Sequence, residues 1–181
     1  LVPEEGRFMQ QVKDGGREVE ALVVDEIADT LMEEMEDDTL YLVGPGSTTA
    51  GLMAAMGLDN TLLGVDLVRN GQLLARDVSA RQIEQAVVGF NGPVSIIITP
   101  IGGQGMLLGR GNQQLTPAII RRAGRDNLIV VATKTKITQL AGRPLMVDSN
   151  DPQLDRELAG YVPVLTGYRD RILYPISYGA T

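Results

Sequence analysis

The chain has 181 residues, 44% of them hydrophobic, and a formal net charge of −7. This length suffices to bury a core, and the acidic balance argues against a nucleic-acid partner, which requires a basic face. Cysteine and histidine are absent, which excludes disulfides, a thiol nucleophile, a Ser-His triad and histidine metal ligands. Any acid–base chemistry falls to Asp, Glu, Lys or Tyr, or to another part of the protein.

The sequence shows no sign of a membrane span or of a secretory leader. No apolar run reaches the ~20 residues that a spanning helix needs, so we expect a cytoplasmic protein without a membrane partner. The chain begins with Leu1 rather than Met, and we therefore expect a fragment of a longer protein, or a processed product. In the absence of repeats or a clear linker, we expect one domain over residues 1–181.

The N-terminal part predicts a strand end and then an amphipathic helix. Apolar and polar residues alternate over residues 8–12 before Gly15-Gly16, which predicts a strand that ends in a turn. Residues 25–35 carry apolar side chains at helical spacing. The expected buried face consists of Ile27, Leu31, Met32 and Met35. The acidic residues that follow have no fixed geometry for a metal, so we expect a solvated helix end at Glu33, Glu34, Glu36, Asp37 and Asp38.

Residues 39–43 predict a short buried strand, and the stretch to about Met56 predicts a helix. The turn between them reads Gly-Pro-Gly-Ser-Thr-Thr. This layout is typical of anion binding, because free N–H groups of the first helical turn and the positive end of the helix dipole face the ligand. No lysine follows the glycines, so the turn is not a P-loop. The alternative is plain N-capping by Ser47. The candidate phosphate-binding residues are Gly44, Gly46, Ser47, Thr48 and Thr49.

An antiparallel hairpin is predicted over residues 62–78, because Asn70-Gly71 lies between two alternating stretches. Asp66 falls on the first of these strands. Its carboxylate is either a buried functional group, as a metal or hydroxyl partner and candidate catalytic residue, or a solvated residue on the outer face. The pattern of the strand does not separate these two interpretations.

The most informative stretch runs from Val94 to Pro117, VSIIITPIGGQGMLLGRGNQQLTP. It opens with a buried strand, residues 94–98, and ends at Thr116-Pro117, which predicts the start of a helix. Glycines let the backbone approach a ligand closely, and Arg110 offers a planar donor fork suited to phosphate. The alternative is a flexible surface loop. The candidate nucleotide-binding residues are Gly102, Gly103, Gln104, Gly105, Arg110, Asn112 and Gln113.

The remaining residues continue the alternation of helices and strands. Helices are predicted after Ser79, over residues 117–123 before Gly124, and over residues 155–158. Strands are predicted over residues 128–133, 145–147, 161–165 and 171–176. Three polar residues, Lys134-Thr135-Lys136, follow the first of these strands. They either contact a ligand, as strand ends do in open sheets, or form a solvated loop.

These elements predict an α/β fold with a mainly parallel or mixed sheet, helices on both faces and one antiparallel hairpin near residues 62–78. Both glycine loops leave the ends of apolar strands. If those strands are parallel neighbours, the loops converge on one crevice. We therefore expect Ser47 and Arg110 to open onto a shared anion pocket.

Together, LVGPGSTTAGL and ITPIGGQGMLLGRGNQQLTPAIIRRAG resemble the ATP-NAD kinase-like family that includes the acetoin-catabolism X protein. The opening VPEEGRFMQQVK and the ending LMVDSNDPQLDRELAGYVPVLTGYRDRILYPI are also similar to that family, so the resemblance covers nearly the whole chain. The glycine-rich loop is the specific part. The Gly-Pro-Gly-Ser-Thr-Thr turn also occurs in phosphosugar isomerases and sugar-responsive repressor domains.

The resemblance implies transfer of a phosphoryl group from ATP or polyphosphate to the 2′-hydroxyl of NAD, with a divalent metal such as Mg²⁺, and hence NADP biosynthesis. The family's Gly-Gly-Asp-Gly-Thr motif, whose aspartate would be the catalytic carboxylate, is absent. The chain therefore resembles the C-terminal, nucleotide-binding half, inactive alone, whose partner in cis is a missing N-terminal domain. By resemblance, Gly46, Ser47 and Thr48 match a turn that contacts dinucleotide in NAD kinases.

Two other functions remain open at the level of sequence. The first is a sugar-phosphate-binding sensor or isomerase-like domain, for which Asp66 or Asp148 would supply the proton-shuttling carboxylate. The second is a structural or oligomerising half, which the missing catalytic motif favours. The alternating α/β pattern and the acidic surface are compatible with a homodimer.

Overall fold

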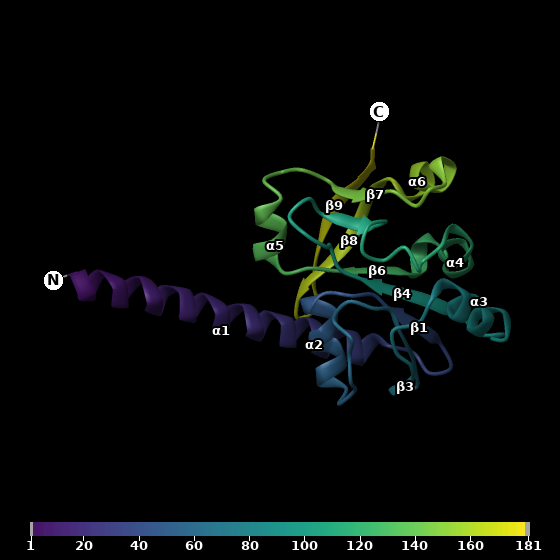
Figure 1. The fold of residues 1–181 in the computed structure, drawn as a ribbon, viewed down its shortest axis with the longest axis horizontal. Coiled ribbons are helices and arrows are strands. Elements are labelled where there is room, and N and C mark those ends of the chain that lie inside the picture. The colour runs from purple at the N-terminus through teal and green to yellow at the C-terminus, as the bar shows by residue number, and fades with distance from the viewer. Residues whose placement is uncertain (1, 180–181) are drawn as a thin grey trace.

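The structure, a computed structural model, describes residues 2–179, with side chains from Gly15 onward. A nine-stranded sheet with the order β3-β2-β1-β4-β6-β8-β9-β7-β5 forms the centre, and helices flank it (Figure 1). The strands are β1 (Leu40–Val43), β2 (Asp66–Arg69), β3 (Gln72–Ala75), β4 (Val94–Ile98), β5 (Met106–Leu108), β6 (Leu128–Val131), β7 (Leu145–Val147), β8 (Gly160–Gly167) and β9 (Asp170–Tyr178). The helices are α1 (Val2–Glu34), α2 (Ser47–Ala55), α3 (Ala80–Val88), α4 (Pro117–Ala123), α5 (Lys134–Gln139) and α6 (Pro152–Leu158), with a short 3₁₀ helix at Arg125–Asn127.

The direction of the strands divides the sheet into two parts. Strands β1, β4, β6 and β8 are parallel neighbours in the middle of the sheet. Strand β9 is antiparallel to β8, and β7 and β5 follow β9 in parallel, so these three strands run against the central four. Strands β1, β2 and β3 pair antiparallel in turn. The predicted α/β class, mixed sheet and hairpin are confirmed, although β2 and β3 are shorter than residues 62–78.

Helices cover both faces of the sheet, as predicted. On one face, α1 and α2 pack through Ile27, Leu31 and Leu52 against Tyr41 and Ile97. On the other face, side chains of α3, α4 and α6 pack against alternate residues of the same strands. Because successive side chains of a strand point to opposite faces, the apolar central strands supply a core on each side.

The strand and turn predicted for the first 16 residues are wrong, because a single helix, α1, runs from Val2 to Glu34. Gly15 and Gly16 do not end it. Glycine lowers helix stability by about 1 kcal/mol relative to Ala but does not forbid the helical backbone, and neither glycine has a positive φ. Figure 1 shows α1 extending far beyond the sheet.

Most of the other predicted elements are confirmed. The strands at Val94–Ile98 and Leu145–Val147 and the helix at Pro117–Ala123 have the predicted bounds. Ser79 caps α3 in a capping box with Gln82. Thr116 occupies the N-cap position of α4, but its hydroxyl hydrogen-bonds to the Glu84 carboxylate instead of to the helix.

Candidate functional site

The Gly-Pro-Gly-Ser-Thr-Thr turn follows the carboxyl end of β1 and rests against the end of β4. The Gly44 amide donates a hydrogen bond to the Ile97 carbonyl, 2.8 Å away. A Cβ atom on Gly46 would lie 2.4 Å from Cγ2 of Thr99, and the Gly46 backbone has a φ of +134° that favours glycine. The hydroxyl of Thr49 fixes the turn from inside by a 2.7 Å hydrogen bond to the Gly44 carbonyl. Gly46 is therefore required for close packing of two strand ends.

The chain leaves β1 and β4 toward opposite faces of the sheet. After β1 it enters α2, whose Leu52 and Met53 pack in the core on the α1 side. After β4 it passes through β5 to α4, whose Ile119 and Ile120 pack in the core of the other face. In open α/β sheets, ligands bind outside the carboxyl ends of the strands at such a topological switch point. The topology therefore makes the junction of β1 and β4 a candidate binding site.

Two buried hydroxyls at this junction have no hydrogen-bond partner. Thr48 belongs to the first turn of α2 and Thr99 follows β4; the residues are 2% and 1% exposed, and the Oγ1 atom of each is unpaired. A buried polar atom without a partner costs about 1–3 kcal/mol. Gly46, the N-cap residue of α2, has no side chain to cap the helix. The junction therefore combines two unpaired hydroxyls with an uncapped helix N-terminus, which suits an anion.

Asp66 is buried, at 3% exposure. This burial excludes the interpretation of Asp66 as a solvated residue on the outer face. Its Oδ1 accepts hydrogen bonds from the Thr61 hydroxyl and from the Asp77 amide. Asp66 also lines a small cavity of about 10 Å³ beside Gly44 and Gly46. These bonds hold together the two segments that flank the hairpin, and Asp66 itself pairs with Val43 at the end of β1.

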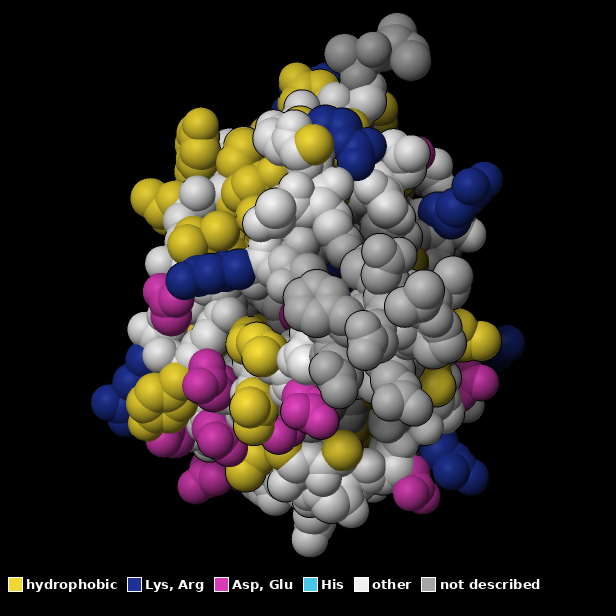
Figure 2. Space-filling model, turned by 90° about the vertical axis from the view of Figure 1, so that its left-hand side faces the viewer, with side chains coloured by type: hydrophobic (Ala, Val, Ile, Leu, Met, Phe, Trp, Pro, Cys, Tyr) yellow, Lys and Arg dark blue, Asp and Glu magenta, His cyan; other side chains and the backbone are white. Residues whose placement is uncertain are grey.

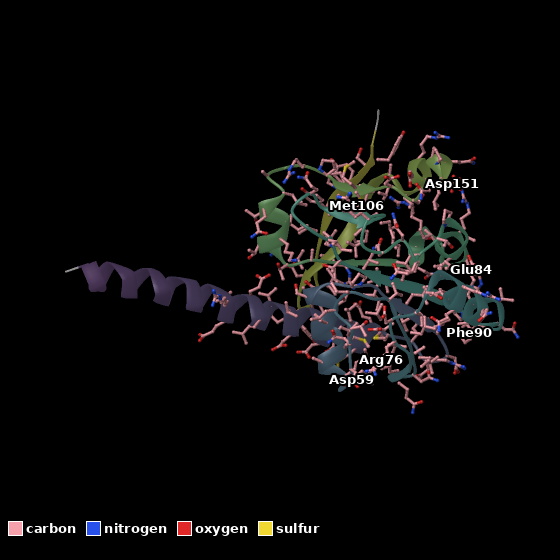
Figure 3. The ribbon with its side chains drawn as sticks, in the orientation of Figure 1. Asp59, Arg76, Glu84, Phe90, Met106 and Asp151 are labelled. Atoms are coloured by element: carbon pink, nitrogen blue, oxygen red, sulfur yellow. The ribbon has the colours of Figure 1, made fainter. Side chains whose placement is uncertain are left out.

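The expected shared pocket of Ser47 and Arg110 does not follow from the topology. Arg110 comes after the carboxyl end of β5, which runs against β1 and β4, so it lies toward the opposite edge of the sheet. The backbone at Gly109 lies against the Asp148 carbonyl at the end of β7. Figure 3 shows Met106 of β5 beside β7, far from Asp59 and Arg76 near α2 and β3. The first residue of the loop, Thr99, lies against the turn at Gly46.

The other predicted residues of the glycine-rich loop have mixed surroundings. Gly102 and Gly103 have open space where a Cβ would stand. Arg143 donates hydrogen bonds to the Gly103 carbonyl and to the Gln104 side chain, 3.0 and 3.1 Å away. Gly105 is buried and Gln113 is exposed.

Asn112 is engaged within the loop itself. It is 1% exposed, its Oδ1 accepts from the Gly109 amide, and its Nδ2 donates to the Leu107 carbonyl. These bonds account for both ends of the side-chain amide and close the loop after β5. They give Asn112 a role in the conformation of the loop, whereas the sequence suggested direct binding of a nucleotide.

A larger cavity, of about 660 Å³, lies along the same edge of the sheet, and its lining includes Lys134 and Thr135, two of the three polar residues considered from the sequence as possible ligand contacts. Its lining includes Thr133 and Lys134 after β6, Thr166 at the end of β8, and part of α1. Buried threonines thus lie at the end of each of the four parallel strands or in the segment that follows it. These threonines are Thr48 and Thr49 after β1, Thr99 after β4, Thr133 after β6 and Thr166 in β8. This recurrence of threonine after an apolar run is the signal that could have found the whole edge.

The described residues contain no group of three or more acidic side chains that could hold a metal ion. The acidic run is exposed, as predicted, at Glu33, Glu34, Glu36, Asp37 and Asp38. None of the helices between residues 2 and 179 combines the length and the apolar character of a membrane span.

Comparison with known families gives a match over most of the chain. The family described as the ATP-NAD kinase C-terminal domain matches residues 36–176, which include both glycine loops and the whole sheet apart from the last two residues of β9. Comparisons with curated proteins and with solved structures give no match. The family match agrees with the resemblance seen in the two loops and extends over most of the chain. The chain belongs to the ATP-NAD kinase C-terminal domain family.

Proposed function

We propose that this chain is the nucleotide-binding part of a kinase that phosphorylates NAD to NADP, and that it binds the phosphates of a nucleotide at the junction of β1 and β4. The observation that carries the proposal is the pair of unpaired, buried hydroxyls of Thr48 and Thr99 at a topological switch point. Membership of the ATP-NAD kinase C-terminal domain family supports the reaction class.

The chemistry of the junction is that of phosphate positioning. Hydroxyls of Ser47, Thr48 and Thr99 and the amides of the first turn of α2 are donors, and phosphate oxygens are acceptors. Donors fixed in a buried setting orient the phosphates without reorganisation, and phosphoryl transfer depends mainly on such positioning and on charge stabilisation. These residues would therefore hold a nucleotide in a single orientation.

The turn after β1 does not account for the catalytic carboxylate or the metal ion of the proposed reaction. The donors at the turn are hydroxyls and amides, and Asp66 is the one carboxylate that lines its cavity among the described residues. This set does not fit a divalent cation, which prefers several carboxylate or carbonyl oxygens, so we assign no metal-dependent step to it. We propose that a second domain in cis supplies the catalytic aspartate. ATP or polyphosphate as donor, a homodimer and a cytoplasmic location stay predictions.

Isothermal titration calorimetry on the chain tests the proposal. NAD, NADP, ATP and pyrophosphate are titrated into the wild type and into a variant with both Thr48→Val and Thr99→Val. Because each lost hydrogen bond to a charged group costs about 1.5–3 kcal/mol, the double variant should bind at least about tenfold more weakly. Thr138→Val, an exposed threonine of α5, is the matched control and should bind like the wild type.

Three outcomes would redirect the proposal. Absence of any nucleotide binding by folded wild type would remove it. Loss of binding in Arg110→Ala, with the double threonine variant unchanged, would move the phosphate site to the glycine-rich loop. Thermal protection by phosphosugars but not by NAD would favour the sugar-phosphate-binding alternative.

A further inference from the structure

The cavity of about 660 Å³ lies between α1 and the carboxyl ends of β6 and β8. Its floor includes Thr133 and Thr166, both at most 2% exposed, and α1 supplies one wall through Val19, Glu20 and Val23. Figure 1 shows α5 and the outer part of α1 on the same side of the sheet. This is the edge toward which the phosphate-binding turn also faces, because β1, β4, β6 and β8 are parallel.

The cavity lies close to the turn at β1. Neighbouring strands are ~4.8 Å apart, so the β1–β4 junction and the β6–β8 junction are separated by two strand positions, or about 10 Å. On α1, Val23 lines the cavity, while Val24 touches α2 at Gly51, one helical turn after Ser47. An extended dinucleotide is long enough to reach from one junction to the other.

The charges of the cavity disfavour phosphate there. Among the residues whose side chains the structure describes, three carboxylates, Glu20, Glu26 and Asp170, line it together with one lysine. That lysine, Lys134, is paired with Asp170 at 2.7 Å. Figure 2, which looks onto this side of the molecule, shows acidic side chains gathered in its lower part. A net negative cavity repels a phosphate group but accepts the hydroxyls of a sugar, which donate hydrogen bonds to carboxylates.

Glu20 is the carboxylate best placed to accept a hydrogen bond from a sugar hydroxyl. The hydroxyl of Thr133 donates to its Oε1 over 2.6 Å, which orients the carboxylate at the end of β6. No hydrogen bond or ion pair is described for its Oε2. The side chains of Val19 and Val23 beside it give an apolar wall against which a sugar ring can pack. Carboxylates hold the ribose hydroxyls of NAD in this manner in other dinucleotide-binding sheets.

We propose that this cavity binds the adenosine ribose of the dinucleotide, with Glu20 as the acceptor for the 2′-hydroxyl, while the phosphates lie at the turn that contains Ser47. The inference rests on the proposed function and adds to it a preference between the two dinucleotides. A ribose with a free 2′-hydroxyl fits the cavity, whereas a 2′-phosphate meets three carboxylates. The domain therefore prefers NAD to NADP, and the same charges favour release of the phosphorylated product.

The test is the ratio of the Kd for NADP to the Kd for NAD, measured by calorimetry on the whole chain. For the wild type the ratio should exceed about ten, the value for a single lost hydrogen bond to a charged group. Glu20→Gln keeps an acceptor for Thr133 and removes the charge, so NAD should bind more weakly, NADP more tightly, and the ratio should fall severalfold. Glu18→Gln, an exposed glutamate on the same helix, should leave the ratio unchanged.

A second variant tests the cavity itself. Val19→Trp fills it from an exposed position on α1, so it should weaken NAD binding at least about tenfold and leave pyrophosphate binding at the turn intact. A wild-type ratio near one, an unchanged ratio in Glu20→Gln, or full NAD binding by Val19→Trp would each overturn the inference while the proposed phosphate site stands. Absence of all nucleotide and pyrophosphate binding would overturn both.

Discussion

At the scale of single residues, the threonines of the sheet edge have two distinct roles. Thr49 is satisfied inside the protein, because its hydroxyl donates to the Gly44 carbonyl over 2.7 Å. Thr48 and Thr99 are equally buried, but their hydroxyls have no partner. A protein holds such unpaired groups at a cost in stability, and they are expected where a ligand completes the hydrogen bonding.

The stability of valine variants should separate these roles. In the absence of ligand, Thr48→Val and Thr99→Val should be as stable as the wild type or more stable by up to about 1 kcal/mol, because an unpaired buried hydroxyl is replaced by a methyl group. Thr49→Val should lose about 1 kcal/mol or more, because a buried carbonyl loses its donor. Urea unfolding measures all three. Equal losses in the three variants would mean that all three hydroxyls are paired.

At the scale of elements, α1 is the helix whose position depends most on side chains from distant parts of the chain. Ile27 and Leu31 are buried against the sheet. Glu33 anchors the end of the helix, since it accepts hydrogen bonds from the Tyr168 hydroxyl and from Arg169. The Tyr168 hydrogen bond first, and then the Arg169 guanidinium, lower the pKa of Glu33 from its ordinary value of 4.5.

The lowered pKa of Glu33 makes its contribution to stability depend on pH. Because the folded-state pKa is below 4.5, the contribution is fully present above 4.5 and is lost as the pH falls through the lowered value. Glu33→Gln should therefore be slightly less stable than the wild type at pH 7, the effect being small because the group is exposed to solvent. Urea unfolding at pH 7 and at pH 3 tests this.

The difference between Glu33→Gln and the wild type should shrink at the acidic pH. Asp29→Asn, an exposed change on the same helix, serves as the control for a general loss of negative charge. A difference that persists undiminished at pH 3, or one that Asp29→Asn reproduces, would contradict the assignment of this anchor to the Glu33 carboxylate.

At the scale of the whole molecule, the protection of backbone amides from hydrogen exchange should differ between the central and the edge strands of the sheet. Strand β4 is buried along its whole length and β6 at Val130 and Val131, and both strands are paired on both sides, whereas β3 and β5 are edge strands. Native-state hydrogen exchange should therefore be slowest for amides of Ile96–Ile98. Within α1, the segment with exposed Val19 and Leu22 should exchange faster than the segment with buried Ile27 and Leu31. Uniform exchange along α1 would show that its outer part has a further packing partner.

The elements were predictable where local signals agree with the tertiary structure. The strand at Val94–Ile98 is β-branched and apolar because both of its faces are buried, and the helix at Pro117 starts at a Thr-Pro pair and ends at a glycine. The helix through Gly15-Gly16 and the strand at Met106–Leu108 were missed. The helix continues through the two glycines because helical residues lie on both sides of them. The strand exists because it pairs with Leu145–Val147, about 40 residues later.

The sequence by itself determined the α/β class, because local spacing of apolar residues, glycines and helix caps encodes the elements, and the likeness of its two glycine loops already indicated the family. Only the tertiary structure decided which loops meet. Strand β5 pairs in parallel with β7, on the reversed part of the sheet, so Arg110 lies away from the turn, while Thr99 and the cavity beside Glu20 lie on its side. Strand order and direction arise from long-range pairing, which no local pattern of residues records.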